Sequence, residues 1–113
     1  MSRDLKQIIP PQQLGAGTSL LYTVPLNRST VVTRISLINT SSEARFVNIW
    51  FVPNGSVPAD DNKIVDNLFV SAQETFSPPD VEGQVLPSQN TIQAQAEVAT
   101  AITIIGSGTE VTN

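Results

Sequence analysis

The sequence contains no cysteine and no histidine. Without cysteine the chain forms no disulfide and has no thiol nucleophile. Without histidine it lacks the usual zinc ligands and the general base of a Ser-His-Asp triad. These two absences exclude many hydrolytic and metal-dependent mechanisms. We expect no cofactor and no enzymatic activity.

Basic residues are also scarce. Lysine and arginine together number 6 against 10 acidic residues, which gives a formal net charge of −4. The six are scattered singly, whereas neutralising several phosphates requires a clustered basic face. We therefore expect no nucleic-acid partner and no adhesion to anionic membranes. No segment is apolar enough for a signal peptide or a membrane span, so synthesis in the cytosol is expected.

The side chains that are present favour a β-protein with a weakly charged surface. Hydrophobic residues make up 40% of the 113 residues, but aromatic residues only 5% and charged residues 14%. A surface rich in Ser, Thr, Asn and Gln around a Val, Ile, Leu and Ala core suits contact with other proteins. A chain of this length is typical of a single domain.

Strand and turn signals alternate from Gly15 onward. The segment 30–38 is rich in β-branched residues, and its alternate positions predict one apolar face. A turn over 39–42 separates it from the strand predicted at 45–52, so the two are expected to form an antiparallel hairpin. The predicted apolar face consists of Val31, Thr33, Ile35 and Leu37.

The second half of the chain continues the pattern. The segment 64–70 fits either a short helix or a strand, and the surrounding β-pattern favours the strand. Residues 91–98 alternate cleanly, and a last strand at 101–105 is expected to end at Gly106-Ser107-Gly108. About seven or eight short strands predict an all-β fold, an antiparallel β-sandwich or jelly roll. The inward positions of 91–98 are Ile92, Ala94, Ala96 and Val98.

Proline-rich segments outline the expected interfaces. Because Pro-Pro fixes an extended backbone, residues 1–13 are predicted to form an N-terminal arm outside the core, with 14–113 as a single β-sandwich domain. Deleting the arm should then leave the fold intact. The loops at 54–62 and 77–90 are expected to contact neighbours. The candidate interface residues are Ile8, Ile9, Pro10, Pro11, Asn54, Val57, Pro58, Pro78 and Pro79.

Two acidic groups and two aromatic residues are weaker candidates for a site. Asp60, Asp61, Asn62 and Asp66 are oxygen donors of the kind that bind calcium, but their spacing matches no EF-hand. Asp80 and Glu82 form a carboxylate pair, yet a chain this short has little material for a sugar cleft. Trp50 and Tyr22 are candidate stacking platforms for a glycan, although the strand face of Trp50 favours a core or interface role.

Four segments combine strand and turn signals in a distinctive order and spacing. They are LLYTVP (20–25), STVVTRISLINTSS (29–42), VNIWFVPNGS (47–56) and TIQAQAEVATAITIIGSGTE (91–110). In this order and spacing they resemble small proteins encoded among the structural genes of tailed bacteriophages. The likeness covers residues 14–110 and leaves 1–13 outside it. It implies a β-sandwich virion component of the head-decorating, head-fibre or tail-associated type, with no catalytic residue to carry over.

Residue pattern and resemblance together predict a capsid-decorating or cement protein located in the virion and assembled in the host cytoplasm. Its expected partners are the major capsid protein or other virion proteins and further copies of itself, with a trimer favoured. A tail or fibre module of the same particle is the first alternative. A carbohydrate-binding β-sandwich that uses Trp50 or Tyr22 is the second.

Overall fold

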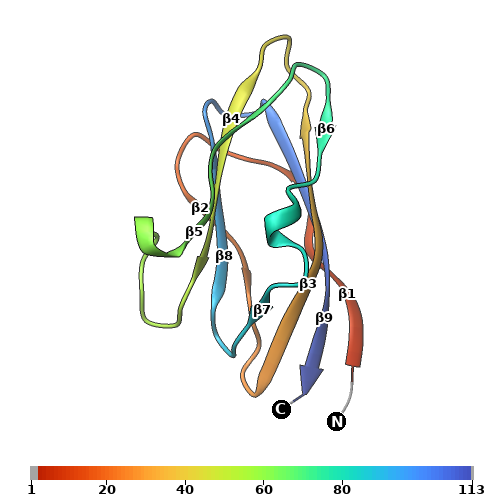
Figure 1. Cartoon of the computed structure of the whole chain (residues 1–113), viewed down its shortest axis with the longest axis vertical. Helices are drawn as coiled ribbons and strands as arrows, with labels where there is room; N and C mark the ends of the chain where they lie inside the picture. Colours follow the sequence, from red (N-terminus) through yellow and green to blue (C-terminus); the bar gives the residue numbers. More distant parts are fainter. Residues whose placement is uncertain (1–2, 113) are drawn as a thin grey trace.

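The computed structural model describes residues 3–112 and contains two antiparallel sheets packed face to face as a β-sandwich (Figure 1). This confirms the all-β fold predicted from the sequence. No helix in the described part of the chain is long and apolar enough to cross a membrane.

Sheet A runs β1 (Arg3–Gln13), β9 (Ile102–Thr112) and β3 (Arg28–Asn39), and the short strands β6 (Thr75–Phe76) and β7 (Val85–Leu86) both pair with the far edge of β3. Sheet B runs β2 (Ser19–Thr23), β8 (Thr91–Ala96), β4 (Arg45–Val52) and β5 (Lys63–Val70). Two 3₁₀ turns, η1 (Asp60–Asn62) and η2 (Pro79–Val81), lie in the connections.

Aliphatic side chains from the inner faces of both sheets fill the space between them. The alternation predicted for 91–98 is confirmed over β8, whose inward positions are buried and whose outward positions are partly exposed, but the strand ends at Ala96 and Val98 is half-buried beyond it. In β4, Val47 and Ile49 belong to the core, but Asn48 and Trp50 are buried as well, so burial does not alternate along this strand. The largest fully buried aliphatic side chains are Ile9, Leu14, Ile35, Leu37, Ile49, Ile92, Ile102 and Ile104.

The N-terminal segment is a strand of the sandwich, so the arm predicted outside the core is wrong for the described residues 3–13. Residues 1–2 of that prediction lie outside the described part. β1 pairs with β9, and Ile8 and Ile9 are buried in the core. Proline is tolerated here because β1 is an edge strand, whose outward backbone groups need no partner.

Two glycines of β9 make room for these isoleucines. A Cβ at Gly106 would lie 3.0 Å from Cδ1 of Ile9. A Cβ at Gly108 would lie 3.2 Å from Cδ1 of Ile8 and 2.8 Å from the carbonyl oxygen of Val31. The glycines therefore belong to the strand and do not end it as the sequence suggested. β9 continues through them to Thr112.

A bulge in β3 reverses its side-chain alternation. The pairing of β3 with β9 shifts register between Val32 and Arg34. On the N-terminal side of the bulge Val32 is buried and Val31 is half-exposed, whereas on the C-terminal side Ile35 is buried. Since a bulge inserts one residue, it moves every later side chain to the opposite face. The predicted inward positions of Val31 and Thr33 are wrong for this reason.

The predicted hairpin of 30–38 with 45–52 is also wrong, because β3 and β4 belong to different sheets. The connection between them crosses from sheet A to sheet B around the buried side chain of Asn39. Its Nδ2 donates to the carbonyl oxygens of Glu43 at 2.8 Å and Val70 at 2.9 Å. Its Oδ1 accepts from the amide of Ser41 at 2.9 Å. Asn39 thus fixes a corner where the sequence suggested a tight turn.

The ambiguous segment 64–70 is strand, as favoured, and forms most of β5. β5 is irregular: its pairing with β4 shifts register on both sides of Ile49. Asn67 adopts a left-handed φ of 47°, and its amide donates to Oδ1 of Asn48 at 2.7 Å. This free edge of sheet B is therefore distorted, which discourages pairing with another strand.

We predict that Gly108→Ala lowers the free energy of unfolding by about 1–3 kcal/mol, the usual effect of overpacking a core. The new methyl group would meet the backbone oxygen of Val31, which cannot rotate away. That penalty exceeds the gain of about 0.4–1 kcal/mol from restricting the unfolded chain. Urea unfolding measures the change. Gly17→Ala is the control, because nothing lies within 4 Å of its Cβ position. Equal midpoints for both variants would contradict the packing argument.

Candidate functional site

A buried carboxylate organises the end of the sandwich where the described N- and C-terminal residues lie side by side (Figure 1). Glu110 of β9 points inward, and its side chain is 2% exposed. Its Oε2 accepts a 2.5 Å hydrogen bond from the Tyr22 hydroxyl, which also lies 2.8 Å from Oγ1 of Thr30. Its Oε1 lies 3.3 Å from Nζ of Lys6 and 3.4 Å from Nη1 of Arg28.

This cluster, called here the Glu110 network, joins both sheets. Tyr22 lies on β2 of sheet B, whereas Glu110, Arg28 and Lys6 come from three strands of sheet A. Arg28 also binds Oδ2 of Asp4 at 2.7 Å. Two carboxylates and two cations balance in charge, and a buried carboxylate is tolerated only when its oxygens are paired in this way. The network therefore holds the first residues of β1 against the body of the protein.

The network changes the proton affinity of two of its members. Burial, and then the hydrogen bond to Glu110, raise the pKa of Tyr22 well above its ordinary value. The hydrogen bond to Asp4 raises the pKa of Arg28. Tyr22 consequently stays a neutral donor across the physiological pH range, which suits a structural bond and not proton transfer. An open hollow of about 470 Å³ beside it is lined by Asp4, Leu5, Lys6, Pro25, Arg28 and Glu110.

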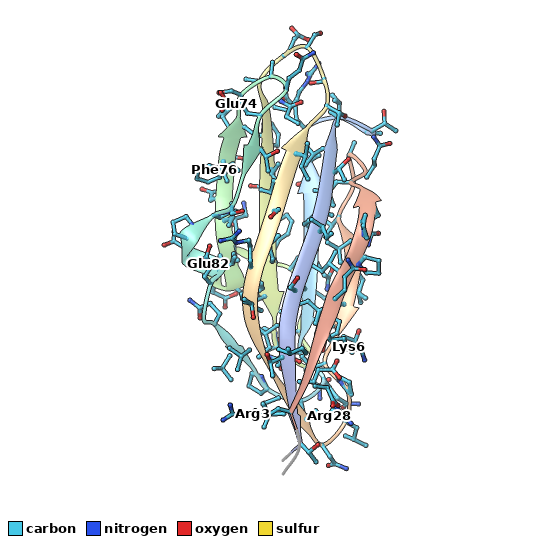
Figure 2. All side chains as sticks on the ribbon, turned by 90° about the vertical axis from the view of Figure 1, so that its right-hand side faces the viewer. Arg3, Lys6, Arg28, Glu74, Phe76 and Glu82 are labelled. Carbon is cyan, nitrogen blue, oxygen red and sulfur yellow. The ribbon has the colours of Figure 1, made fainter. Side chains whose placement is uncertain are left out.

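The first residues of β1 form a regular strand with a free edge. Arg3 to Lys6 pair without interruption with Val111 to Gly108 of β9. No described strand pairs with the other side of β1, which forms the margin of the sheet in Figure 2. Farther along, the pairing shifts register around Ile9, and Pro10 and Pro11 lack the amide hydrogen that a new partner strand would need.

Other free edges offer shorter regular stretches among the described residues. β2 has five residues and a register shift between Leu20 and Tyr22. β5 is distorted at Asn67, as described above. β6 and β7 have two residues each. The longest regular run on a free edge is therefore the beginning of β1.

Three aliphatic side chains and one threonine line up across the outer face of sheet A. Leu5 pairs with Thr109, Thr109 with Val31, and Val31 with Val85. Leu5 is 89% exposed and Val85 is 60% exposed, whereas Val31 and Thr109 are partly exposed. We call these four residues the sheet A row. Exposed aliphatic residues are common one at a time, but several on one flat face are a candidate interaction surface.

The ladder residues on either side of the sheet A row are uncharged or basic. On one side they are Arg3, Val111 and Ser29, and on the other side they are Ser107 and Arg34. The acidic Glu82 lies nearby, because the amide of the next residue, Gly83, donates to the carbonyl oxygen of Val32. An apolar partner surface with acidic groups opposite Arg3 and Arg34 would match these ladder residues.

The predicted interface residues do not form one surface. Ile8, Ile9 and Pro78 are buried, which excludes them from contact with a neighbour in this structure. Pro10 and Pro11 are exposed on β1, Pro79 is exposed in η2, and Asn54 and Val57 are exposed in the loop 53–59, with Pro58 half-buried there. The amide of Asn54 donates to Oδ1 of Asn90, which ties this loop to the turn before β8.

The weaker candidates receive little support from the geometry. Within residues 3–112 no three acidic side chains gather as metal ligands. Asp66 pairs with Lys63 at 2.9 Å, and Asn62 bonds within its own loop. Trp50 is buried, and Nζ of Lys63 lies 5.2 Å from its ring centroid. A buried ring fits the core-or-interface interpretation and offers no open platform for a sugar.

Sequence reasoning missed Leu5, Val31 and Val85. Leu5 stands between charged residues in the segment predicted to be an arm, and Val31 falls on the face predicted to be core. Leu5 is the one apolar residue in the segment 3–7, so no alternation of apolar and polar residues indicated a strand there. Only the pairing of four strands, however, shows that these residues are neighbours.

The sequence matches no protein-family model and no curated protein. Solved structures do share the fold. A protein of the disulfide-linked pili that form Bacillus endospore appendages aligns with a TM-score of 0.63 at 11% identity, over 98% of this chain and 88% of that one. A chain of infectious bursal disease virus, Gx strain, gives 0.57 at 11% identity, over 96% of this chain and 32% of that one. A chain of the T13 particle of the same virus gives 0.53 at 10% identity, over 97% and 31%.

This chain therefore spans about a third of the length of these viral chains. At such low identities the likeness defines the fold alone. The class it defines is an antiparallel β-sandwich, similar in fold to a pilus protein and to part of a viral chain.

We predict that Tyr22 ionises only when the protein unfolds in alkali. Its folded pKa is raised, so the stability that it contributes is complete below the unfolded value of 10.0 and is lost as the pH rises from there towards the folded value. The chain has one tyrosine, so phenolate absorbance reports this residue alone. The absorbance should rise together with the loss of the β-sheet circular dichroism signal. Ionisation near pH 10.0 with the fold intact would contradict the raised pKa.

Tyr22→Phe should lower the free energy of unfolding by about 1–3 kcal/mol at neutral pH, because Glu110 loses a buried hydrogen-bond donor. The free energy of unfolding of this variant should also fall less between neutral and alkaline pH than that of the unmodified protein, because the variant has no phenol to ionise. Urea unfolding of both proteins at several pH values measures the two effects. A stability difference that does not change with pH would show that Tyr22 does not cause the alkaline loss.

Proposed function

We propose that the chain is a non-enzymatic structural component of a bacteriophage particle, and that it decorates the capsid by binding capsid protein and other copies of itself. The observation that carries this proposal is the sheet A row, in which Leu5 and Val85 are exposed and Val31 and Thr109 are partly exposed. The resemblance of residues 14–110 to virion components and the sandwich fold support it. Location in the virion, with assembly in the host cytoplasm, is part of the proposal.

The sheet A row has the properties of a docking surface for a large, flat partner. Its residues lie on four hydrogen-bonded strands, so the surface is pre-formed and loses little conformational freedom on binding. Burying one aliphatic side chain contributes about 1.5–3 kcal/mol. The row alone gives a modest affinity, which many copies on a symmetric particle raise through avidity. We propose that the capsid supplies an apolar patch bordered by carboxylates.

A position on the tail or on a fibre would use the same fold and the same surface, and the experiment below separates the two. The homotrimer favoured from the sequence stays a prediction. Glycan binding remains the interpretation to test only if no particle carries the protein, because Trp50 is buried.

The direct test is to label intact particles of the source virus with a gold-conjugated antibody against this protein and to locate the gold by electron microscopy. Gold distributed evenly over the heads is the expected result. Gold confined to tails would move the protein to the tail and keep its structural role. Unlabelled particles, with the protein present in infected cells, would overturn the proposal.

We predict that Val85→Asp weakens binding to undecorated heads about tenfold or more, because it removes an aliphatic contact of the kind that contributes about 1.5–3 kcal/mol. Sedimentation of the protein with heads measures the affinity. Leu20→Asp is the matched control, since Leu20 is 59% exposed but lies on sheet B. Equal binding by both variants would exclude the sheet A row as the capsid contact.

Deleting residues 1–13, the test suggested by the sequence, is not informative. It would remove β1 together with Ile8 and Ile9, which are buried in the core. We expect such a truncated chain to unfold, so surface substitutions replace it.

A further inference from the structure

We infer that the beginning of β1 pairs with the same segment of a second copy, antiparallel and about a two-fold axis at Leu5. The partner is thus a second copy of this chain, and the contact joins two copies of sheet A into one continuous sheet. This inference deepens the proposed structural role and rests on it for the need to self-associate. It concerns the edge of sheet A, whereas the capsid contact proposed above concerns its face.

The backbone confines such pairing to one short segment. Arg3 to Lys6 is the longest regular run on a free edge in the described chain, as shown above. Pro10 and Pro11 prevent the new ladder from extending along β1, because each lacks an amide hydrogen. An exposed regular edge is a ready template for a strand of another chain.

The side chains of this segment are complementary to themselves. In an antiparallel pair centred on Leu5, Asp4 lies opposite Lys6 of the second copy, and Leu5 lies opposite Leu5. Opposite charges in directly opposite positions stabilise an antiparallel pair, and like charges destabilise it. A two-fold axis at Asp4 would place Asp4 opposite Asp4 of the second copy, and an axis at Lys6 would place Lys6 opposite Lys6. Both arrangements oppose like charges. The sequence therefore favours one register.

The Glu110 network extends across this contact. Asp4 and Lys6 pair with the inward positions Glu110 and Gly108, so both side chains lie on the inner side of the sheet. Each is half-exposed and bound within its own copy, Asp4 to Arg28 and Lys6 to Glu110. On pairing, Asp4 of one copy lies between its own Arg28 and Lys6 of the second copy. That Lys6 in turn binds Glu110 of the second copy, so positive and negative side chains alternate across the contact. The Glu110 network, whose Arg28 and Lys6 lie on the same side of the strands in Figure 2, would then bridge two copies.

Pairing of two copies would also join the outer faces of their two sheets A. Leu5, the most exposed of the large hydrophobic residues at 89%, would contact its symmetry mate. The sheet A row would then run without a break through both copies. The contact is isologous and forms a closed dimer. A trimer, as favoured from the sequence, would need a separate contact.

Cysteine cross-linking tests the register directly. Residues directly opposite in an antiparallel pair have Cα atoms about 4.5 or 5.5 Å apart, and both distances fit a disulfide. The chain has no cysteine, so Leu5→Cys introduces a single thiol at an exposed position. Under mild oxidation this variant should form covalent dimers at least about tenfold faster than Leu20→Cys or Val85→Cys, which are exposed thiols away from the axis. Equal rates for all three variants would overturn the inference.

Charge reversal tests the complementarity without a covalent bond. Asp4→Lys and Lys6→Asp each place like charges opposite one another in a homodimer. Sedimentation velocity should show self-association weakened at least about fivefold for each variant alone. An equimolar mixture should restore it, because at both positions a lysine of one variant then faces an aspartate of the other. Circular dichroism of each variant checks the fold. A mixture that associates no better than its components would overturn the proposed pairing.

Both experiments use purified protein without particles, so their failure leaves capsid decoration untouched. Conversely, a protein that dimerises through Leu5 but labels no particle would overturn the proposed function and leave the dimer intact.

Discussion

Two isoleucines of β1 occupy a space that exists because β9 carries glycine at two inward-facing positions. Any side chain at Gly108 would meet the carbonyl oxygen of Val31 and the side chain of Ile8, so this close approach of three strands requires glycine. The packing converts a proline-containing N-terminal segment into a strand of sheet A. The free edge of β1, the exposed position of Leu5 and the alignment of the sheet A row all depend on it.

The Glu110 network adds a polar constraint at the same end of the sandwich. Hydrophobic packing holds β1 at Ile8 and Ile9, whereas Asp4 and Lys6 hold its beginning through Arg28 and Glu110. A buried carboxylate is a poor source of stability in itself, but it specifies position because its partners must be in place. Packing and charge together present a strand edge that is both regular and fixed, as the proposed pairing of two copies requires.

The sequence predicted the strands well wherever their alternation is uninterrupted, as in β8. It failed where a tertiary feature overrode a local signal. The bulge near Arg34 reversed the faces of Val31, and Asn39 turned an apparent hairpin into a crossover between sheets. The candidate site was hidden for a related reason. Leu5, Val31 and Val85 are far apart in the chain, and only the register of the strands between them makes them neighbours.

Pairing of β1 with β9 also determines when the proposed contacts can form. Lys6 and Glu110 are separated by 104 positions, so sheet A is completed only by a contact between distant parts of the chain. A growing polypeptide that has not yet reached β9 lacks the register that aligns Leu5 with Thr109. The proposed docking surface is therefore absent from incomplete chains and forms only after β9 has been synthesised.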